Sequence, residues 1–161
     1  MIEVKNLNKS FGNFKSLDNL SLNVKKGSVY GLVGPNGAGK TTFIKNLMGI
    51  YRPDSGSMTV NGEEVYENPA LKQKIIYISD DLFFFTTYSI LDTAKLYADI
   101  YKDWDWETFN KLKEIFKIDV KRKCCRLSKG MQKQVAFWLG ICTKPDLMVL
   151  DEPMDGLDPV M

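Results

Sequence analysis

A run of glycines and small residues that ends in lysine and threonine constrains this chain more than any other feature. Glycines permit backbone geometries that turn successive N–H groups inward, and a helix that starts at the lysine adds a partial positive charge. Loops of this kind surround phosphate oxygens, with the lysine on the β- and γ-phosphates and the hydroxyl on Mg²⁺. We therefore expect a nucleotide site built by a GxxxxGK[ST] loop, Gly34-Pro35-Asn36-Gly37-Ala38-Gly39-Lys40-Thr41.

The sequence on both sides of this loop predicts an α/β fold. Residues 29–33, just before it, are a continuous apolar run, typical of a strand buried on both faces of a sheet. Asn61-Gly62 is a strong hairpin signal, and periodicity separates the other elements. Strands are expected at residues 17–24, 29–33, 58–60, 74–79 and 147–150, and helices at 40–50, within 89–123 and at 128–142. This order predicts a parallel α/β core with a helical insertion.

Two adjacent carboxylates, Asp151 and Glu152, follow the expected strand 147–150, which reads as fully buried. The carboxyl ends of parallel strands face the ligand crevice. We expect Asp151 to hold Mg²⁺ together with Thr41, and Glu152 to polarise the attacking water as general base. A solvated loop after a core strand is the alternative, and the phosphate loop disfavours it.

Composition excludes several other chemistries. The chain has no histidine, which removes imidazole catalysis and histidine metal sites. Its three cysteines, with Cys124 and Cys125 adjacent, give neither zinc spacing nor a disulfide framework, so reduced thiols in a cytosolic protein are expected. Residues 121–126 with Lys129 and Lys133 are basic but lack interleaved aromatic residues, so we interpret them as a solvated face and expect no nucleic-acid partner.

Two further motifs accompany the phosphate loop and the acidic pair. One is Leu127-Ser128-Lys129-Gly130-Met131-Gln132, and the other is Asp151-Glu152-Pro153-Met154-Asp155-Gly156-Leu157-Asp158-Pro159. In this order the motifs resemble the nucleotide-binding domain of ATP-binding cassette (ABC) proteins, across essentially the whole chain. The resemblance implies a P-loop NTPase core with a mostly parallel sheet, an N-terminal antiparallel β-subdomain and a helical signature subdomain at residues 86–142. Asp158-Pro159 begins a helix that the last residues cut short, so a domain 1–161 that is incomplete at its C-terminus is expected.

The resemblance also implies roles for individual residues. Phe11 corresponds to the aromatic residue that stacks on adenine. Ser128 and Gly130 lie in the signature motif, here with its third and fifth residues replaced, and are expected to contact the γ-phosphate held by a second cassette. Asp158, in the D-loop, is expected to communicate between the two cassettes. The ATP-binding loop is expected to comprise Gly34, Pro35, Asn36, Gly37, Ala38, Gly39, Lys40, Thr41 and Thr42.

An acidic residue, Asp80, occupies the position of the family's Q-loop glutamine. It is expected to coordinate Mg²⁺ or orient water, but it lacks the amide hydrogen-bond donor. The residues expected to take part in hydrolysis are therefore Lys40, Asp80, Ser128, Gly130 and Glu152, and those expected at the metal are Thr41, Asp80 and Asp151.

The resemblance implies that the chain is the ATP-binding and ATP-hydrolysing subunit of an ABC transporter. It is expected to use ATP and Mg²⁺, to dimerise head-to-tail with a second cassette, and to sit on the cytoplasmic face of the membrane through a separate permease. The run Phe83-Phe84-Phe85 is either an edge of the core or an exposed patch that docks the permease.

Two alternatives stay open. One is a soluble ABC ATPase that acts on ribosomes or DNA, although no second cassette or coiled-coil insertion is visible. The other is an ATP-binding fragment without turnover, since the family's switch histidine lies downstream of the D-loop.

Overall fold

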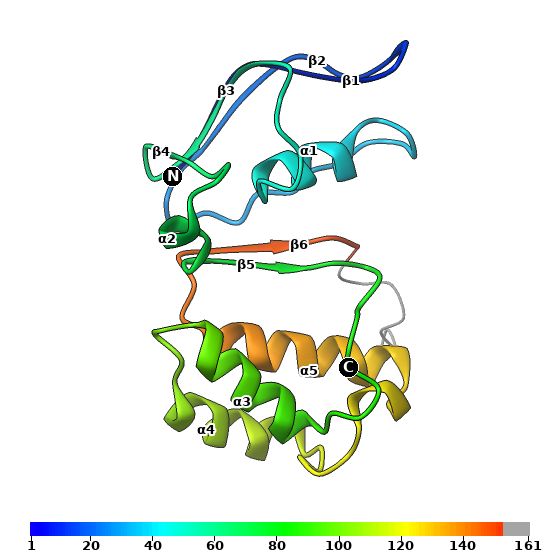
Figure 1. Cartoon of the computed structure of the whole chain (residues 1–161), viewed down its shortest axis with the longest axis vertical. Helices are drawn as coiled ribbons and strands as arrows, with labels where there is room; N and C mark the ends of the chain where they lie inside the picture. Colours follow the sequence, from blue (N-terminus) through cyan, green and yellow to red (C-terminus); the bar gives the residue numbers. More distant parts are fainter. Residues whose placement is uncertain (153–161) are drawn as a thin grey trace. The chain divides into compact units, whose positions relative to one another are not determined.

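The computed structural model describes residues 1–152, which fall into two compact units divided after Lys72 (Figure 1). The first unit contains β1 (Ile2–Phe11), β2 (Phe14–Val24), α1 (Lys40–Leu47), β3 (Ser55–Val60), β4 (Glu63–Glu64) and α2 (Pro69–Lys72). The second contains β5 (Ile75–Ile78), α3 (Ile90–Ile100), α4 (Trp106–Phe116), a 3-10 turn (Cys124–Arg126), α5 (Lys129–Cys142) and β6 (Leu147–Leu150).

An antiparallel sheet with strand order β2-β1-β3-β4 forms the first unit, in agreement with the predicted N-terminal β-subdomain. β1 lies in the middle, so Ile2 is paired with Val24 of β2 and with Val60 of β3. All three side chains are buried. The turn between β3 and β4 places Asn61 and Gly62 at positive φ, which confirms the predicted hairpin.

Helix α1 packs beside β2 in this unit. Its buried side chains are Phe43, Ile44, Asn46 and Leu47, spaced so that they lie on one face of the helix. The helix begins at Lys40, as predicted from the phosphate loop, and ends three residues earlier than the predicted range 40–50. The loop therefore ends at a helix whose buried face packs beside β2.

The apolar run at residues 29–33 does not form the predicted strand. It has no regular secondary structure, and Val29 and Val33 are almost fully exposed. A strand buried on both faces needs hydrogen-bonded neighbours and a covering layer on each side. Among residues 1–152, no strand pairs with this segment. The prediction was therefore wrong in this respect, because an apolar run specifies a preference for burial but does not provide the neighbours.

The second unit is built on a parallel pair of strands, β5 and β6. Ile75 is paired with Leu147 and Ile78 with Leu150, which confirms the predicted strands 74–79 and 147–150. The second strand is not fully buried as predicted, since only Val149 of β6 is buried. Among the described strands, β6 is hydrogen-bonded only to β5.

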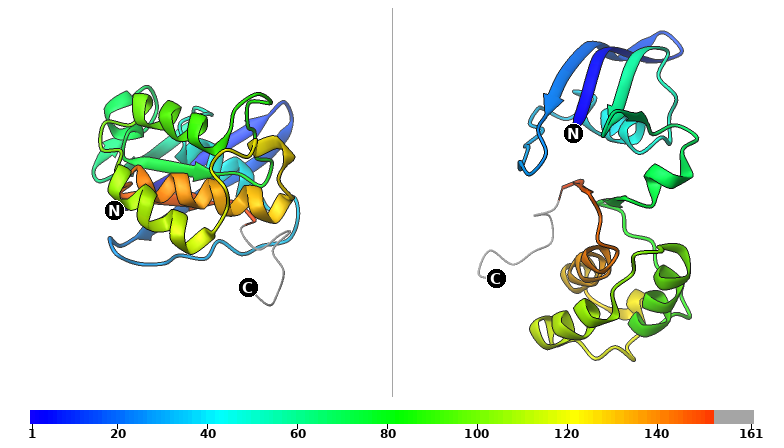
Figure 2. Two further views of the ribbon diagram at one scale, coloured as in Figure 1. Left: turned by 90° about the horizontal axis from the view of Figure 1, so that it is seen from below. Right: turned by 90° about the vertical axis from the view of Figure 1, so that its left-hand side faces the viewer.

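Helices cover one side of this strand pair. α5 lies between the strands and the helices α3 and α4 (Figure 1 and Figure 2). The core of this helical layer centres on Trp138 of α5, which is fully buried and stacks on Phe109 of α4 with ring centroids 4.6 Å apart. The predicted helical insertion and the predicted helix 128–142 are both confirmed.

Side-chain caps fix where these helices begin. Ser89 and Asp92 form a capping box at α3, and Asp105 caps α4 by accepting hydrogen bonds from the amides of Glu107 and Thr108. Trp104, just before this cap, packs against the core of the helical layer. Within residues 1–152, no helix combines the length and the apolar composition that a bilayer span requires.

Candidate functional site

The phosphate loop connects the exposed segment 29–33 to the first turn of α1. Lys40, the first residue of α1, donates hydrogen bonds from Nζ to the carbonyl oxygens of Gly34, at 2.6 Å, and Pro35, at 3.0 Å. The Ala38 amide also donates to the Pro35 carbonyl, at 3.1 Å. Lys40 therefore reaches back over the loop, and its ammonium group lies where the loop backbone turns.

Gly37 and Gly39 give the loop its shape. Both have positive φ, 82° and 87°, a region that other L-residues rarely adopt. Gly39 is also the N-cap of α1, and no side chain caps this helix start. A Cβ added at Gly39 would lie 2.5 Å from the Ser16 carbonyl oxygen of β2. The loop can approach β2 this closely only because this residue has no side chain.

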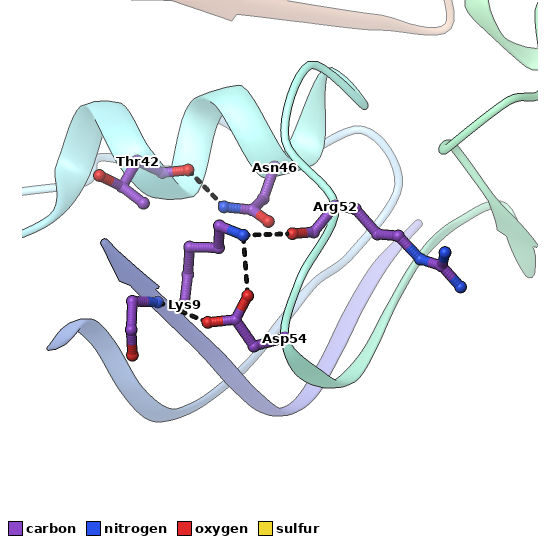
Figure 3. Close-up of polar contacts among 6 residues, drawn as sticks. Lys9, Thr42, Asn46, Arg52 and Asp54 are labelled. Atoms are coloured by element: carbon purple, nitrogen blue, oxygen red, sulfur yellow. Dashed lines mark hydrogen bonds and ion pairs between the residues drawn. The ribbon is translucent and has the colours of Figure 1, made fainter. Parts of the chain in front are cut away.

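The hydroxyl-bearing residues after the lysine lie on the first turn of α1. Ser16 of β2 donates from its hydroxyl to the Thr42 hydroxyl oxygen, at 2.8 Å. Asn46, one turn later, donates from Nδ2 to the Thr42 carbonyl oxygen at 2.8 Å, and its own side-chain oxygen is buried without a partner (Figure 3). Thr42 is therefore fixed from two sides, and it holds the start of α1 beside β2.

Phe11, the expected adenine-stacking residue, ends β1 with its ring partly exposed. It packs edge-on against Tyr51 with ring centroids 5.3 Å apart, and Lys9 Nζ lies 5.7 Å from its centroid. Lys9 donates to the Arg52 carbonyl and to Asp54 Oδ1, each at 2.8 Å (Figure 3). Asp54 Oδ2 also accepts from the Ser10 amide at 2.6 Å. These bonds tie the end of β1 to the loop after α1.

Asp151 directly follows β6. Asp80 follows the neighbouring strand β5 after one intervening residue. The Asp151 amide donates to the Ile78 carbonyl at 3.0 Å, which extends the strand pairing to the carboxylate pair. Tyr77 donates from its hydroxyl to Asp151 Oδ2 at 3.2 Å. Burial first, and then the charge of Asp151, raise the pKa of Tyr77 to about 12, so this phenol stays a hydrogen-bond donor at neutral pH.

One buried lysine, which the sequence analysis placed on a solvated basic face, contacts both loops that follow these strands. Lys133 of α5 is 4% exposed. Its Nζ lies 3.2 Å from Asp80 Oδ1 and donates to the Glu152 carbonyl oxygen at 2.8 Å. The interpretation of Lys133 as solvated was wrong. Helical spacing could have predicted its burial. Lys133 precedes the buried Ala136 and Gly140 by three and seven residues, which places all three on one face of the helix.

Ser128 and Gly130 lie at the start of α5. Ser128 is the N-cap, and its hydroxyl accepts a hydrogen bond from the Met131 amide at 3.3 Å. Gln132 fastens the preceding segment by donating to the carbonyls of Cys124 and Leu127. The N-terminal amides of α5 and the helix dipole thus favour an anion at this end.

The aromatic run at residues 83–85 divides between the two expected environments. Phe84 packs against the core of the helical layer, as an edge of the core would. Phe83 and Phe85 are exposed, and their rings meet edge-on at 5.5 Å. A substitution at Phe84 would therefore disturb packing, and only Phe83 and Phe85 offer an apolar surface.

The donor set expected for Mg²⁺ fits that ion chemically. Mg²⁺ prefers hard oxygen ligands and is usually held by one or two carboxylates together with substrate phosphates. Thr41 supplies a hydroxyl oxygen, and Asp151 and Asp80 supply carboxylate oxygens. The structure brings Asp80, Asp151 and Glu152 to one end of the β5–β6 pair. Phe11 and the phosphate loop belong to the first unit, and the D-loop residue Asp158 lies outside the described residues.

Comparison with known proteins gives a consistent result. The family model described as ABC transporter matches residues 17–155. The ABC transporter ATP-binding protein YtrB of Bacillus subtilis (strain 168) is 35% identical over 160 residues, which cover 99% of this chain and 55% of that protein. The bacitracin transport ATP-binding protein BcrA of Bacillus licheniformis is 32% identical over 163 residues, or 99% of this chain and 53% of that protein.

A solved structure described as the ATP-binding subunit of an ABC transporter superimposes with a TM-score of 0.90 at 26% identity, covering 99% of this chain and 69% of that one. This likeness confirms the predicted α/β fold. The chain spans about half the length of the two curated relatives named above.

Proposed function

Because this chain belongs to the ABC transporter family of ATP-binding proteins, we propose that it binds and hydrolyses ATP as the energy-supplying subunit of a transporter. The observation that carries the proposal is the phosphate loop, with Gly37 and Gly39 at positive φ and Lys40 folded back over it. In this proposal residues 86–142 form the helical subdomain that carries the signature motif.

Residues 34–42 bind the triphosphate. Lys40 exchanges its bonds to the Gly34 and Pro35 carbonyls for bonds to phosphate oxygens, which are stronger acceptors because they are charged. Phe11 stacks on the adenine ring. Thr41 and Asp151 hold Mg²⁺, which when bound neutralises part of the phosphate charge.

Hydrolysis needs a base close to the attacking water. Glu152 accepts the water's proton, and Asp80 orients the water or the metal. Ser128 and Gly130, at the positive end of α5, contact the γ-phosphate held by a second cassette in a head-to-tail dimer. Turnover therefore depends on two copies of the cassette meeting.

Steady-state hydrolysis of MgATP over a range of protein concentrations tests this proposal. We expect turnover to rise more than linearly with protein concentration and to be lost in Glu152→Gln. The matched control is Glu114→Gln on the exposed surface of α4, which we expect to leave turnover unchanged. Measurable ATP binding without turnover would contradict hydrolysis and favour a binding module.

A membrane-spanning permease is the proposed partner, and it would hold the protein at the cytoplasmic face of the membrane. Phe83 and Phe85 are the proposed contact surface, since they are exposed next to the core residue Phe84. Phe83→Glu is expected to abolish co-purification with the permease while ATP hydrolysis persists. Ile115→Glu, at another exposed apolar side chain, is the control. Co-purification that survives Phe83→Glu, or that is lost equally in Ile115→Glu, would contradict this surface.

A further inference from the structure

A buried lysine links the two loops that carry the proposed hydrolytic carboxylates. Lys133 lies in the second turn of α5, and 6% of its side chain is exposed. An ammonium group removed from water is costly unless it is paired and hydrogen-bonded. Lys133 meets this requirement through the Asp80 carboxylate, at 3.2 Å, and the Glu152 carbonyl oxygen, at 2.8 Å.

The two contacts differ in kind. Asp80 contributes a charged side chain that is 42% exposed, so that pair is partly solvated. Glu152 contributes its backbone carbonyl, and its backbone has a φ of 47°, a conformation that non-glycine residues adopt at a cost. Lys133 therefore hydrogen-bonds to the backbone of Glu152, and the conformation of that backbone determines the direction in which the Glu152 carboxylate points.

Helix α5 supplies a rigid base for both contacts. Lys133, Ala136 and Gly140 lie on one face of α5, and a Cβ added at Gly140 would lie 3.4 Å from Ile76 Cγ1 of β5. This face is therefore the one that packs on the strand pair (Figure 1). Asp80 and Glu152 each lie two residues beyond the ends of β5 and β6. Ser128 caps the same helix five residues earlier in the chain.

We infer that Lys133 is a positioning residue for hydrolysis, which ties Asp80 and Glu152 to the helix that carries Ser128 and Gly130. The inference rests on the proposed function. Lys133 acts by holding the Glu152 carboxylate and the Asp80 side chain at fixed positions relative to α5. It does not itself contact the reacting atoms in this account, and nucleotide binding through residues 34–42 is independent of it.

Loss of this link is expected to lower kcat and leave nucleotide binding unchanged. Lys133→Met keeps the aliphatic stem and removes both hydrogen bonds, and the partner left behind, Asp80, is 42% exposed and stays solvated, so the variant is expected to fold. We expect kcat to fall by about 10- to 100-fold, the range seen when groups that hold reacting residues in place are removed. The KM for MgATP is expected to change by less than about twofold, because ground-state binding is untouched.

A double-mutant cycle in the full-length protein tests the route of the effect. Lys133→Met, Asp80→Asn and the double variant are compared by kcat, KM, nucleotide Kd and midpoint of thermal unfolding. Lys113→Met, at an exposed position of α4, is the matched control. We expect the double variant to be no more than about threefold slower than the slower single variant, since each single change removes the Lys133–Asp80 ion pair through which Lys133 holds Asp80.

The other outcomes would overturn the role of Lys133, its link to Asp80 or the proposed function, each by a different result. A kcat within twofold of the wild type in Lys133→Met, with wild-type turnover intact, overturns the inference and leaves the proposed function standing. Losses that multiply in the double variant overturn the Asp80 part of the link. A raised nucleotide Kd together with a lower unfolding midpoint shows a packing role instead. Absence of turnover in the wild type itself overturns the proposed function, and the inference with it.

Discussion

Gly37 and Gly39 of the phosphate loop form a natural pair for measuring how close packing shapes the loop. Their φ values are nearly equal, 82° and 87°, so an alanine at either position pays a similar conformational cost. This cost is about 1–2 kcal/mol for an L-residue in the left-handed region. The surroundings differ: a Cβ at Gly37 meets nothing within 4 Å, whereas one at Gly39 lies 2.5 Å from the Ser16 carbonyl oxygen and 3.0 Å from Leu17 Cδ2.

Gly39→Ala is therefore expected to cost more than Gly37→Ala. The Ser16 carbonyl belongs to β2 and cannot rotate away as a flexible side chain would, so the loop must move. Overpacking of this kind costs about 1–3 kcal/mol, which added to the conformational term gives about 2–5 kcal/mol for Gly39→Ala. The displaced loop is also expected to bind ATP more weakly than the Gly37→Ala loop does.

Urea unfolding followed by far-ultraviolet circular dichroism measures the difference. Indole fluorescence is unsuitable, because Trp104, Trp106 and Trp138 all lie outside residues 1–72. Binding of a fluorescent ATP analogue gives the second readout. Equal free-energy losses in the two variants would refute the argument, since they would show that the approach to β2 does not constrain the loop.

Two further predictions concern the core of the helical layer and the N-terminal sheet. Trp138→Phe removes the hydrogen bond from Nε1 to the Phe109 carbonyl, at 3.0 Å, and is expected to lower the free energy of unfolding by about 1–3 kcal/mol in urea denaturation; a loss below about 0.5 kcal/mol would contradict this. The hydrogen bond from Lys9, and then that from the Ser10 amide, lower the pKa of Asp54 below 3.8 in the folded state. Asp54 therefore stabilises the sheet at neutral pH, and this contribution is lost as the pH falls through its lowered folded pKa. Asp54→Asn is expected to reduce the loss of stability between about pH 5 and pH 2, and an unchanged acid profile would refute the assignment.

Local features of this fold were predictable from sequence because they depend on short stretches of chain. Asn61-Gly62 specifies a hairpin through its own backbone preferences. Ser128 and Asp105 start helices by accepting hydrogen bonds from amides two or three residues ahead. The phosphate loop is of the same kind, since its glycines and the helix that follows are adjacent in sequence. The strands β5 and β6 were also predicted from their apolar runs, but that they lie side by side came only from the structure.

Burial depended on partners that lie far away in sequence. The apolar run 29–33 and the charged Lys133 were both assigned environments from their residue types, and the structure reversed both assignments. Lys133 is buried because the loops after β5 and β6 supply an anion and a carbonyl to pair with it. Phe84 packs inward while Phe83 and Phe85 stay exposed, although the three residues are identical. Residue type sets the free energy of transfer from water, but only the tertiary arrangement determines which groups are available to replace the water.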